Sequence, residues 1–145
     1  MSAFVTPLSA TETDEFAGLW TLDAPLSYDS DLAGSRITAP KGFITDFASV
    51  PRILGIYDLE GGKCNKAAVI HDWLYSTQVV SRETADKILR EAIVASGYSQ
   101  FTAAMFYAAV RIGGASHWKQ PNVPQSQTVN TAMQNSWLDL TFSSP

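Results

Sequence analysis

The stretch AAVIHDWLY, residues 67–75, joins an apolar run to two adjacent ionisable residues, and it constrains the fold more than any other part of the sequence. Asn65 can cap a helix that runs through this stretch. On that helix the side chains of His71 and Asp72 point about 100° apart. Each therefore shares a different helix face with residues of the apolar run. Because a bare carboxylate in such surroundings is costly to bury, we expect a cation or hydrogen-bond donors beside Asp72.

Groups that could meet this pair lie in other segments. The turn GFITDFASVPR, residues 42–52, contributes Asp46. The segment SRETADKILREAIVASG, residues 81–97, contributes Asp86, which lies one helical turn from an arginine on either side. The cations available to the acidic groups are Arg52, Arg82, Arg90 and Arg111. We expect these ionisable groups to meet as a single cluster where the sheet joins the helices.

Two further helices are predicted after the first. Ser81 can cap a helix that Gly97 ends, and the apolar residues of this helix recur on one face. A third helix lies in SQFTAAMFYAAVRIGG, residues 99–114, and ends at Gly113 and Gly114. Its residues are apolar almost all round, which predicts that this helix is buried.

The N-terminal part of the chain has the composition of strands. Two segments rich in aromatic, aliphatic and β-branched residues, 18–30 and 35–47, flank the turn formers DSDLAGS, and this arrangement predicts a β-hairpin. The fold class that follows is α+β, with an N-terminal β-hairpin or small antiparallel sheet packed on three helices. We expect a polar N-terminal arm over residues 1–15 and a single domain over residues 16–118.

Residues 119–145 differ from the rest in composition, because they are rich in Asn, Gln, Ser, Thr and Pro. A solvated tail would rarely keep several large apolar side chains, so we expect an extended arm that docks on a neighbouring protein. The alternative is an arm that folds back over its own domain. The residues expected to bind a partner are Trp118, Trp137, Leu138, Leu140 and Phe142.

Charge and composition argue against several classes of partner. The formal net charge is −4 and the pI is about 5.0, which argues against nucleic acid as the main partner. No apolar run approaches the ~20 residues that span a bilayer, and no signal peptide is visible, so we expect no membrane insertion. The single cysteine, Cys64, excludes an internal disulfide and a multi-cysteine zinc site.

Three interpretations of the predicted cluster remain open. In the first, Arg52 and Arg111 neutralise the acidic groups, and the cluster, with Asp86 and Tyr75, is a polar network that fixes the fold. We favour this interpretation because an isolated His-Asp pair is a weak signal of chemistry, and no firm cofactor follows from it.

The other two interpretations are catalytic. Imidazole and carboxylate groups are accepted ligands of a divalent metal such as zinc, so Asp46, His71 and Asp86 could hold an ion that activates water for hydrolysis. Without a metal, His71 could act as a general base oriented by a carboxylate, Asp72 or Asp46. Ser49 could then be a nucleophile, although no G-x-S-x-G turn surrounds it.

Four segments of the chain together resemble domain-of-unknown-function family 1353, which is common in tailed bacteriophages and prophages. The segments are GFITDFASVPR, AAVIHDWLY, SRETADKILREAI and AAMFYAAVRIGG, and the resemblance runs from about Trp20 to Trp118. The family's pattern is matched here at Asp46, Arg52, His71, Asp72, Trp73, Tyr75, Ala85, Asp86, Val110 and Arg111.

The resemblance implies a phage or prophage setting and does not imply a reaction. Our first expectation is a structural component of a bacteriophage tail, baseplate or fibre assembly. Such a component would bind other virion proteins through its C-terminal arm and would be found in the virion after synthesis in the host cytoplasm. The alternatives are a metal-dependent peptidoglycan hydrolase that acts in cell-wall penetration or lysis, and a tail-assembly chaperone that is absent from the finished particle.

Overall fold

Two small antiparallel sheets form the N-terminal part of the computed structural model, which describes residues 1–47 and 64–119. One sheet has the strand order β1-β4-β5, and the other has the order β2-β3-β6. The strands are β1 (Ala3–Phe4), β2 (Ala10–Asp14), β3 (Leu19–Leu22), β4 (Leu26–Ser30), β5 (Ser35–Ala39) and β6 (Ile44–Thr45). The fold class is α+β, as predicted, although the strands divide between two sheets.

Strands β4 and β5 form the predicted hairpin. Ser30 pairs with Ser35 at its end, and the turn between them contains Gly34, whose φ of 65° lies in the left-handed region that favours glycine. Along β5, Ile37 and Ala39 are buried while the residue between them is exposed. This alternation is typical of a half-buried strand, so one face of the sheet supplies core side chains.

Residues 1–15, which we predicted to be a loose arm, supply strands to both sheets. Phe4 lies opposite Tyr28 in the β1–β4 pair, and their ring centroids are 4.7 Å apart. Glu12 lies opposite Trp20 in the β2–β3 pair. The prediction of an arm was wrong because it relied on polar composition. Strand β2 is mostly exposed and pairs with β3 through backbone hydrogen bonds, which need no apolar side chains.

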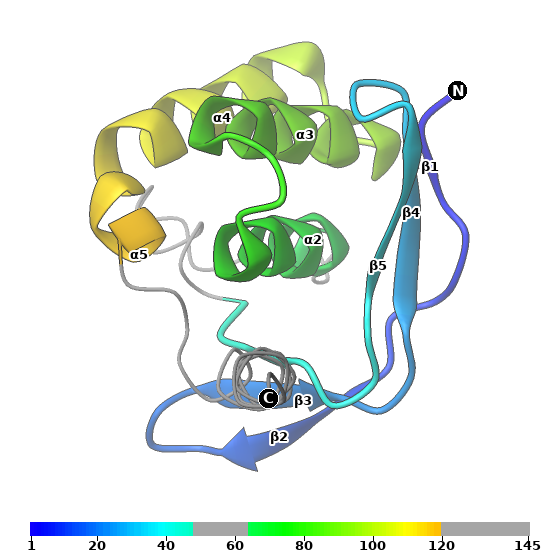
Figure 1. Cartoon of the computed structure of the whole chain (residues 1–145), viewed down its shortest axis with the longest axis vertical. Helices are drawn as coiled ribbons and strands as arrows, with labels where there is room; N and C mark the ends of the chain where they lie inside the picture. Colours follow the sequence, from blue (N-terminus) through cyan, green and yellow to red (C-terminus); the bar gives the residue numbers. More distant parts are fainter. Residues whose placement is uncertain (48–63, 120–145) are drawn as a thin grey trace, which may run out of the picture.

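The helical part of the molecule follows the sheets. Figure 1 shows α3 and α4 side by side above α2. The helices are α2 (Asn65–Thr77), α3 (Arg82–Ala95), α4 (Gln100–Gly113) and the short α5 (Ala115–Lys119). The hydroxyls of Ser81 and Ser99 accept hydrogen bonds from backbone N–H groups in the first turns of α3 and α4, so both residues are N-caps. Within residues 1–47 and 64–119, no helix has the length and apolar content that crossing a membrane requires.

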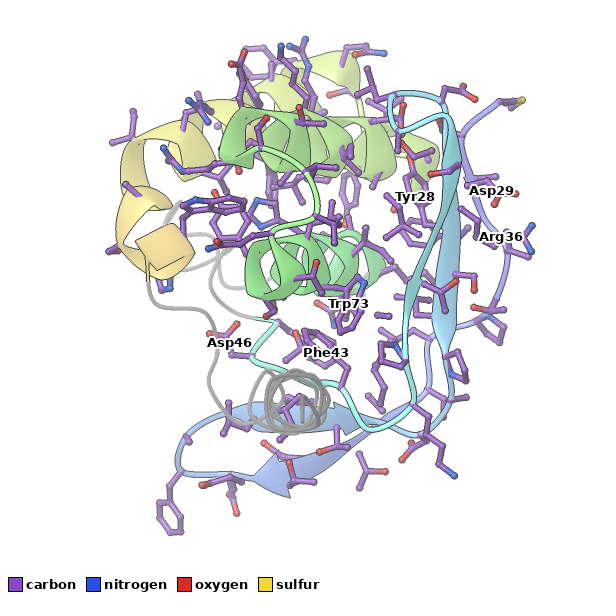
Figure 2. All side chains as sticks on the ribbon, in the orientation of Figure 1. Tyr28, Asp29, Arg36, Phe43, Asp46 and Trp73 are labelled. Carbon is purple, nitrogen blue, oxygen red and sulfur yellow. The ribbon has the colours of Figure 1, made fainter. Side chains whose placement is uncertain are left out.

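Helix α2 lies at the centre of the molecule, between the α3–α4 layer and the sheets (Figure 1). It contains the stretch AAVIHDWLY, in which every residue except Trp73 is buried. Trp73 is half-buried and meets the edge of Phe43 with the ring centroids 5.2 Å apart (Figure 2). The stretch is therefore the central helix of the core, and its two ionisable residues lie inside the protein.

The sequence predicted burial better for α3 than for α4. The predicted face of α3 is buried and consists of Ala85, Ile88, Leu89, Ala92 and Ile93. The prediction that α4 is buried all round is wrong, because Phe101 and Ile112 are 75% and 86% exposed. A helix at the outer edge of a layer has only one face against the core, whatever its composition.

Candidate functional site

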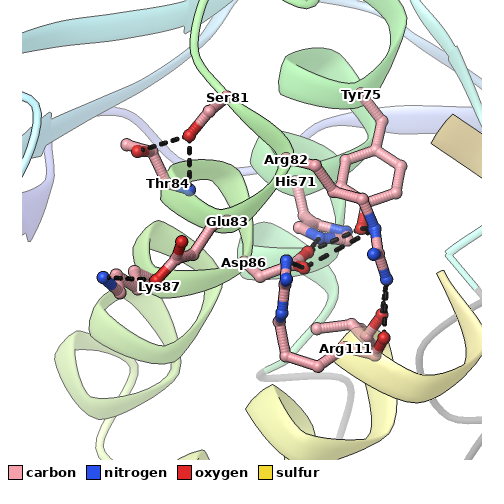
Figure 3. A network of polar contacts seen from close by, with 10 residues as sticks. His71, Tyr75, Ser81, Arg82, Glu83, Thr84, Asp86, Lys87 and Arg111 are labelled. Carbon is pink, nitrogen blue, oxygen red and sulfur yellow. Dashed lines mark hydrogen bonds and ion pairs between the residues drawn. The ribbon is translucent and has the colours of Figure 1, made fainter. Parts of the chain in front are cut away.

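The carboxylate of Asp86 is the centre of a buried polar network (Figure 3). The Asp86 side chain is fully buried. Its Oδ1 accepts hydrogen bonds from the Tyr75 hydroxyl at 2.6 Å and from His71 Nε2 at 2.8 Å. Its Oδ2 accepts a hydrogen bond from Arg111 Nη1 at 2.9 Å. We call these four residues, together with Arg82, the Asp86 network.

Three helices position the Asp86 network. His71 and Tyr75 are four residues apart on α2 and therefore share one face of that helix, where their ring centroids are 4.2 Å apart. Asp86 comes from the buried face of α3, and Arg111 comes from the last turn of α4. The network thus joins α2, α3 and α4 at a single carboxylate.

Arg82 links this carboxylate to the end of α4. Its Nε lies 3.3 Å from the Tyr75 hydroxyl and 3.9 Å from Asp86 Oδ2. Its Nη2 donates to the carbonyl oxygens of Val110 and Arg111 at 2.8 and 2.7 Å. Carbonyls at a helix C-terminus lack intrahelical partners and carry partial negative charge. Arg82 therefore caps α4 and also brings positive charge close to Asp86.

Burial and hydrogen bonding oppose each other in the Asp86 network. Burial alone would raise the pKa of the Asp86 carboxyl, but hydrogen bonds from His71, Tyr75 and Arg111 outweigh it and hold that pKa below its ordinary value. Burial lowers the pKa of His71, against the opposing effect of Asp86. At neutral pH Asp86 is therefore ionised, and His71 is neutral with its proton on Nε2. Burial, followed by the bond to Asp86, raises the pKa of the Tyr75 hydroxyl, which stays protonated.

Asp72 takes part in a second buried contact. Its Oδ2 accepts a hydrogen bond from the Thr45 hydroxyl at 2.6 Å, and Thr45 is fully buried at the end of β6. The backbone N–H of Phe47 donates to the same Thr45 oxygen at 3.4 Å. These contacts divide the predicted single cluster in two, because neighbouring residues on a helix point in different directions. His71 and Asp72 fix α2 to two different parts of the fold.

The structure brings together His71, Tyr75, Asp86 and Arg111, and Arg52, the other member of the predicted network, lies outside the described residues. Asp46, His71 and Asp86 are the set that could hold a metal ion in the alternative interpretation. Asp46 is half-buried in the turn after β6 (Figure 2). Across residues 1–47 and 64–119, no group of three or more His, Cys, Asp or Glu side chains is arranged to hold a metal ion. His71 does meet Asp86, but the remaining contacts of the Asp86 oxygens are made by Tyr75 and Arg111.

Of the residues predicted to bind a partner, the structure describes Trp118. Trp118 is half-buried within its own domain, where its ring meets the edge of Tyr75 at 5.1 Å between centroids. The Trp118 carbonyl accepts a hydrogen bond from the Gln78 side chain at 2.6 Å. These contacts seat α5 against α2, so Trp118 serves the fold of its own chain. The predicted residues that lie outside the described residues are Ser49, Arg52, Trp137, Leu138, Leu140 and Phe142.

Sequence reasoning missed Thr45 and also a second carboxylate contact, at Glu91 on α3. Glu91 Oε1 accepts hydrogen bonds from the hydroxyls of Tyr28 at 2.9 Å and Ser30 at 2.7 Å. Its Oε2 accepts one from the backbone N–H of Leu32 at 3.0 Å. These bonds fix the β4–β5 hairpin to α3. The partners lie far apart in the sequence, so no local pattern signals the contact.

The enclosure of the Asp86 network limits what it can do chemically. A neutral imidazole oriented by a buried carboxylate is an arrangement that general bases use. A base must also reach its substrate, and His71 is only 4% exposed. In the described part of the chain, no buried side-chain nitrogen or oxygen lacks a hydrogen-bond partner. The geometry therefore fits a cross-link between helices better than a reaction centre.

Comparison with protein families identifies the group of proteins that share these motifs. The family model "Protein of unknown function (DUF1353)" matches residues 20–110, more than half of the chain. The chain belongs to this family. The part that matches DUF1353 includes His71, Tyr75 and Asp86 and ends one residue before Arg111. No curated protein and no solved structure matches the chain.

Proposed function

We propose that this chain is a structural subunit of a bacteriophage tail, baseplate or fibre assembly, and that the Asp86 network fixes its fold and catalyses no reaction. The observation that carries the proposal is that both oxygens of the buried Asp86 carboxylate accept hydrogen bonds from the chain itself. The phage setting is an inference from the similarity of the sequence motifs to those of phage and prophage proteins.

These hydrogen bonds support a structural role because side chains of the protein itself already occupy both oxygens of Asp86. A metal ion or a substrate that reached this carboxylate would displace the Tyr75 hydroxyl, the His71 imidazole or the Arg111 guanidinium. A buried donor left without a partner costs about 1–3 kcal/mol. The network therefore favours its closed arrangement over one opened for a ligand.

The surface of the described residues supports a role in assembly. Large apolar side chains are exposed on α4 and at Phe16 in the β2–β3 turn, and only 17% of the whole chain is charged. Exposed apolar patches commonly mark protein–protein contacts. In this proposal the partners are other virion proteins, and the C-terminal segment 119–145 supplies further apolar contacts.

Mass spectrometry of purified virions tests the proposed place of the protein. We expect the chain in the particle at a constant ratio to a major tail protein, and the ratio should survive repeated density-gradient purification. Absence from the finished particle would contradict the proposal and would favour the tail-assembly chaperone.

A variant of His71 separates a structural role from a catalytic one. In His71→Gln the imidazole is removed, but an amide N–H that can donate to Asp86 remains. We expect phage that carry this variant to form infectious particles when circular dichroism shows that the variant protein folds. Loss of infectivity by particles that contain normally folded variant protein would contradict the structural role.

A metal-dependent peptidoglycan hydrolase is the second candidate, and one observation favours it. The buried carboxylate of Asp86 accepts a hydrogen bond from a neutral His71, and histidines that bind a metal commonly donate their other ring N–H to a carboxylate in this way. Elemental analysis of protein purified without chelator, combined with a peptidoglycan zymogram, tests this candidate. A stoichiometric transition metal and clearing that His71→Gln abolishes would support it, and the absence of both would remove it.

A further inference from the structure

Helix α4 has a second apolar face, opposite the one that packs on the core. In the described part of the chain, Phe101, Met105, Ala108 and Ile112 are all exposed. They lie in one row along α4, because residues three and four positions apart share a helix face. The helix runs along the outer edge of the molecule (Figure 1), and the row faces outward. We call these four residues the α4 outer row.

We propose that the α4 outer row is the contact between two copies of this chain, which pack as antiparallel helices about a two-fold axis. The inference goes beyond the function proposed above, since a dimer in solution does not require a place in a virion. The other possible occupants of the row are the C-terminal segment of the same chain and an unrelated protein.

The spacing of the row is that of a helix–helix seam. Its members follow one another at intervals of four, three and four residues, which is the alternation of a and d positions in a coiled coil. A seam of this kind keeps facing a partner helix along its whole length. The inner face of α4 is a separate set of residues, Ala103, Phe106, Ala109 and Val110, which are buried in the core.

The row is self-complementary in the antiparallel direction. Its positions are symmetric about the point between Phe106 and Tyr107. A two-fold axis through that point places Phe101 against Ile112 of the second copy and Met105 against Ala108 of the second copy. At the centre a long side chain therefore meets a small one, so the two helices can approach closely. A two-fold contact needs such a patch, which is complementary to itself.

The charges on α4 also favour a second copy of the chain. Arg111 is the one charged residue of the helix, and its guanidinium pairs with Asp86 at 2.9 Å. The row itself carries no charge, so its four residues would bring no unpaired charge into the contact. The row offers roughly half of the ~800 Å² per partner that a standard interface buries. We therefore expect a weak dimer, with a dissociation constant in the micromolar range or above.

Sedimentation velocity of the full chain, from low micromolar to near-millimolar concentration, tests the proposal. We expect the sedimentation coefficient to rise from that of a monomer to that of a dimer. Met105→Glu should weaken the dimer at least tenfold, because it places a carboxylate in the seam. The matched control is Val79→Glu, which puts the same charge at a position that is 72% exposed between α2 and α3. This control should dimerise as the wild type does.

The predicted register has a test of its own. In the double variant Met105→Glu with Ala108→Lys, each glutamate faces a lysine of the second copy, so dimerisation should recover relative to Met105→Glu. Circular dichroism verifies that each variant is folded. Wild-type protein that stays monomeric at every concentration, or a folded Met105→Glu that dimerises normally, would overturn the proposal. If the protein is monomeric, oxidation by hydroxyl radicals shows whether Met105 is covered. Resistance of Met105 to oxidation would then assign the row to the chain's own C-terminal segment.

Discussion

His71 Nε2 and Asp86 Oδ1 lie 2.8 Å apart in the buried interior, although the two residues come from different helices. The Tyr75 hydroxyl donates to the same oxygen, and Arg111 donates to the other oxygen of the carboxylate. Asp86 is thus bonded to side chains from α2 and α4 while it belongs to α3. Because all these donors converge on one buried group, we regard Asp86 as the cross-link that holds the helical layer together.

Removal of the Asp86 carboxylate should strongly destabilise the fold. In Asp86→Ala the donors of His71 and Tyr75, which are buried, lose their acceptor. Arg111, whose side chain is 34% exposed, loses its ion-pair partner. Each buried donor left without an acceptor should lower the free energy of unfolding by about 1–3 kcal/mol, and the solvated Arg111 should add little. Urea denaturation followed by circular dichroism measures the change.

The matched control for this variant is Asp29→Ala. Asp29 also pairs with an arginine, Arg36, at 2.7 Å, but this pair lies on the surface, with side chains that are 44% and 55% exposed. Surface ion pairs contribute little to stability. The cross-link would be contradicted if Asp86→Ala unfolded at the same urea concentration as Asp29→Ala.

Stability should fall on acidification in two steps. The pKa of His71 is lowered in the folded state, so below its ordinary value of 6.5 the unfolded chain binds more protons than the folded protein. The contribution of His71 to the free energy of unfolding is therefore complete above pH 6.5 and decreases as the pH falls below that value. The lowered pKa of Asp86 adds a second loss below its ordinary value of 3.8.

Variants of the two histidines assign the first step. His71→Gln should remove the decrease that begins near the ordinary His pKa of 6.5. His117→Gln changes an exposed side chain on α5 and should retain the acid-side decrease, because the burial of His71 is the largest cause of its lowered pKa. The assignment fails if the His71→Gln protein retains the full acid-side decrease.

The bond between Thr45 and Asp72 should contribute to stability independently of the Asp86 network. Thr45→Val keeps the shape of the side chain but removes the hydroxyl that donates to Asp72 at 2.6 Å. Loss of this buried hydrogen bond should lower the free energy of unfolding by about 1–3 kcal/mol. The control is Thr38→Val, because the Thr38 hydroxyl bonds the neutral Ser27 hydroxyl and Thr38 is exposed. Equal effects of the two variants would contradict the assigned role of Thr45.

Local sequence patterns predicted the elements that local chemistry controls. The Ser81 cap, the apolar face of α3 and the turn with Gly34 are all present where they were predicted. The turn residues and the helix cap act on neighbouring backbone groups, so they can be identified without knowledge of the fold. The convergence of Asp86 with Arg111 was also predictable in outline, because a buried carboxylate requires nearby donors.

Features that depend on distant parts of the chain could not be predicted from local sequence patterns. Residues 1–15 lack an apolar pattern, yet β1 and β2 complete the two sheets through backbone hydrogen bonds. The exposure of α4 depends on its place at the edge of the helical layer, which composition does not encode. The bond from Thr45 to Asp72 joins residues on different elements, and the sequence around Thr45 carries no signal for it.

A double-mutant cycle between Tyr75→Phe and Asp86→Asn tests most directly whether Asp86 is a cross-link. Tyr75→Phe removes the hydroxyl but keeps the ring that packs against His71 and Trp118. If the two groups stabilise the fold through their 2.6 Å contact, the unfolding free energies of the variants will show a coupling of at least about 1 kcal/mol. Effects that add to within about 0.3–0.5 kcal/mol would contradict the cross-link.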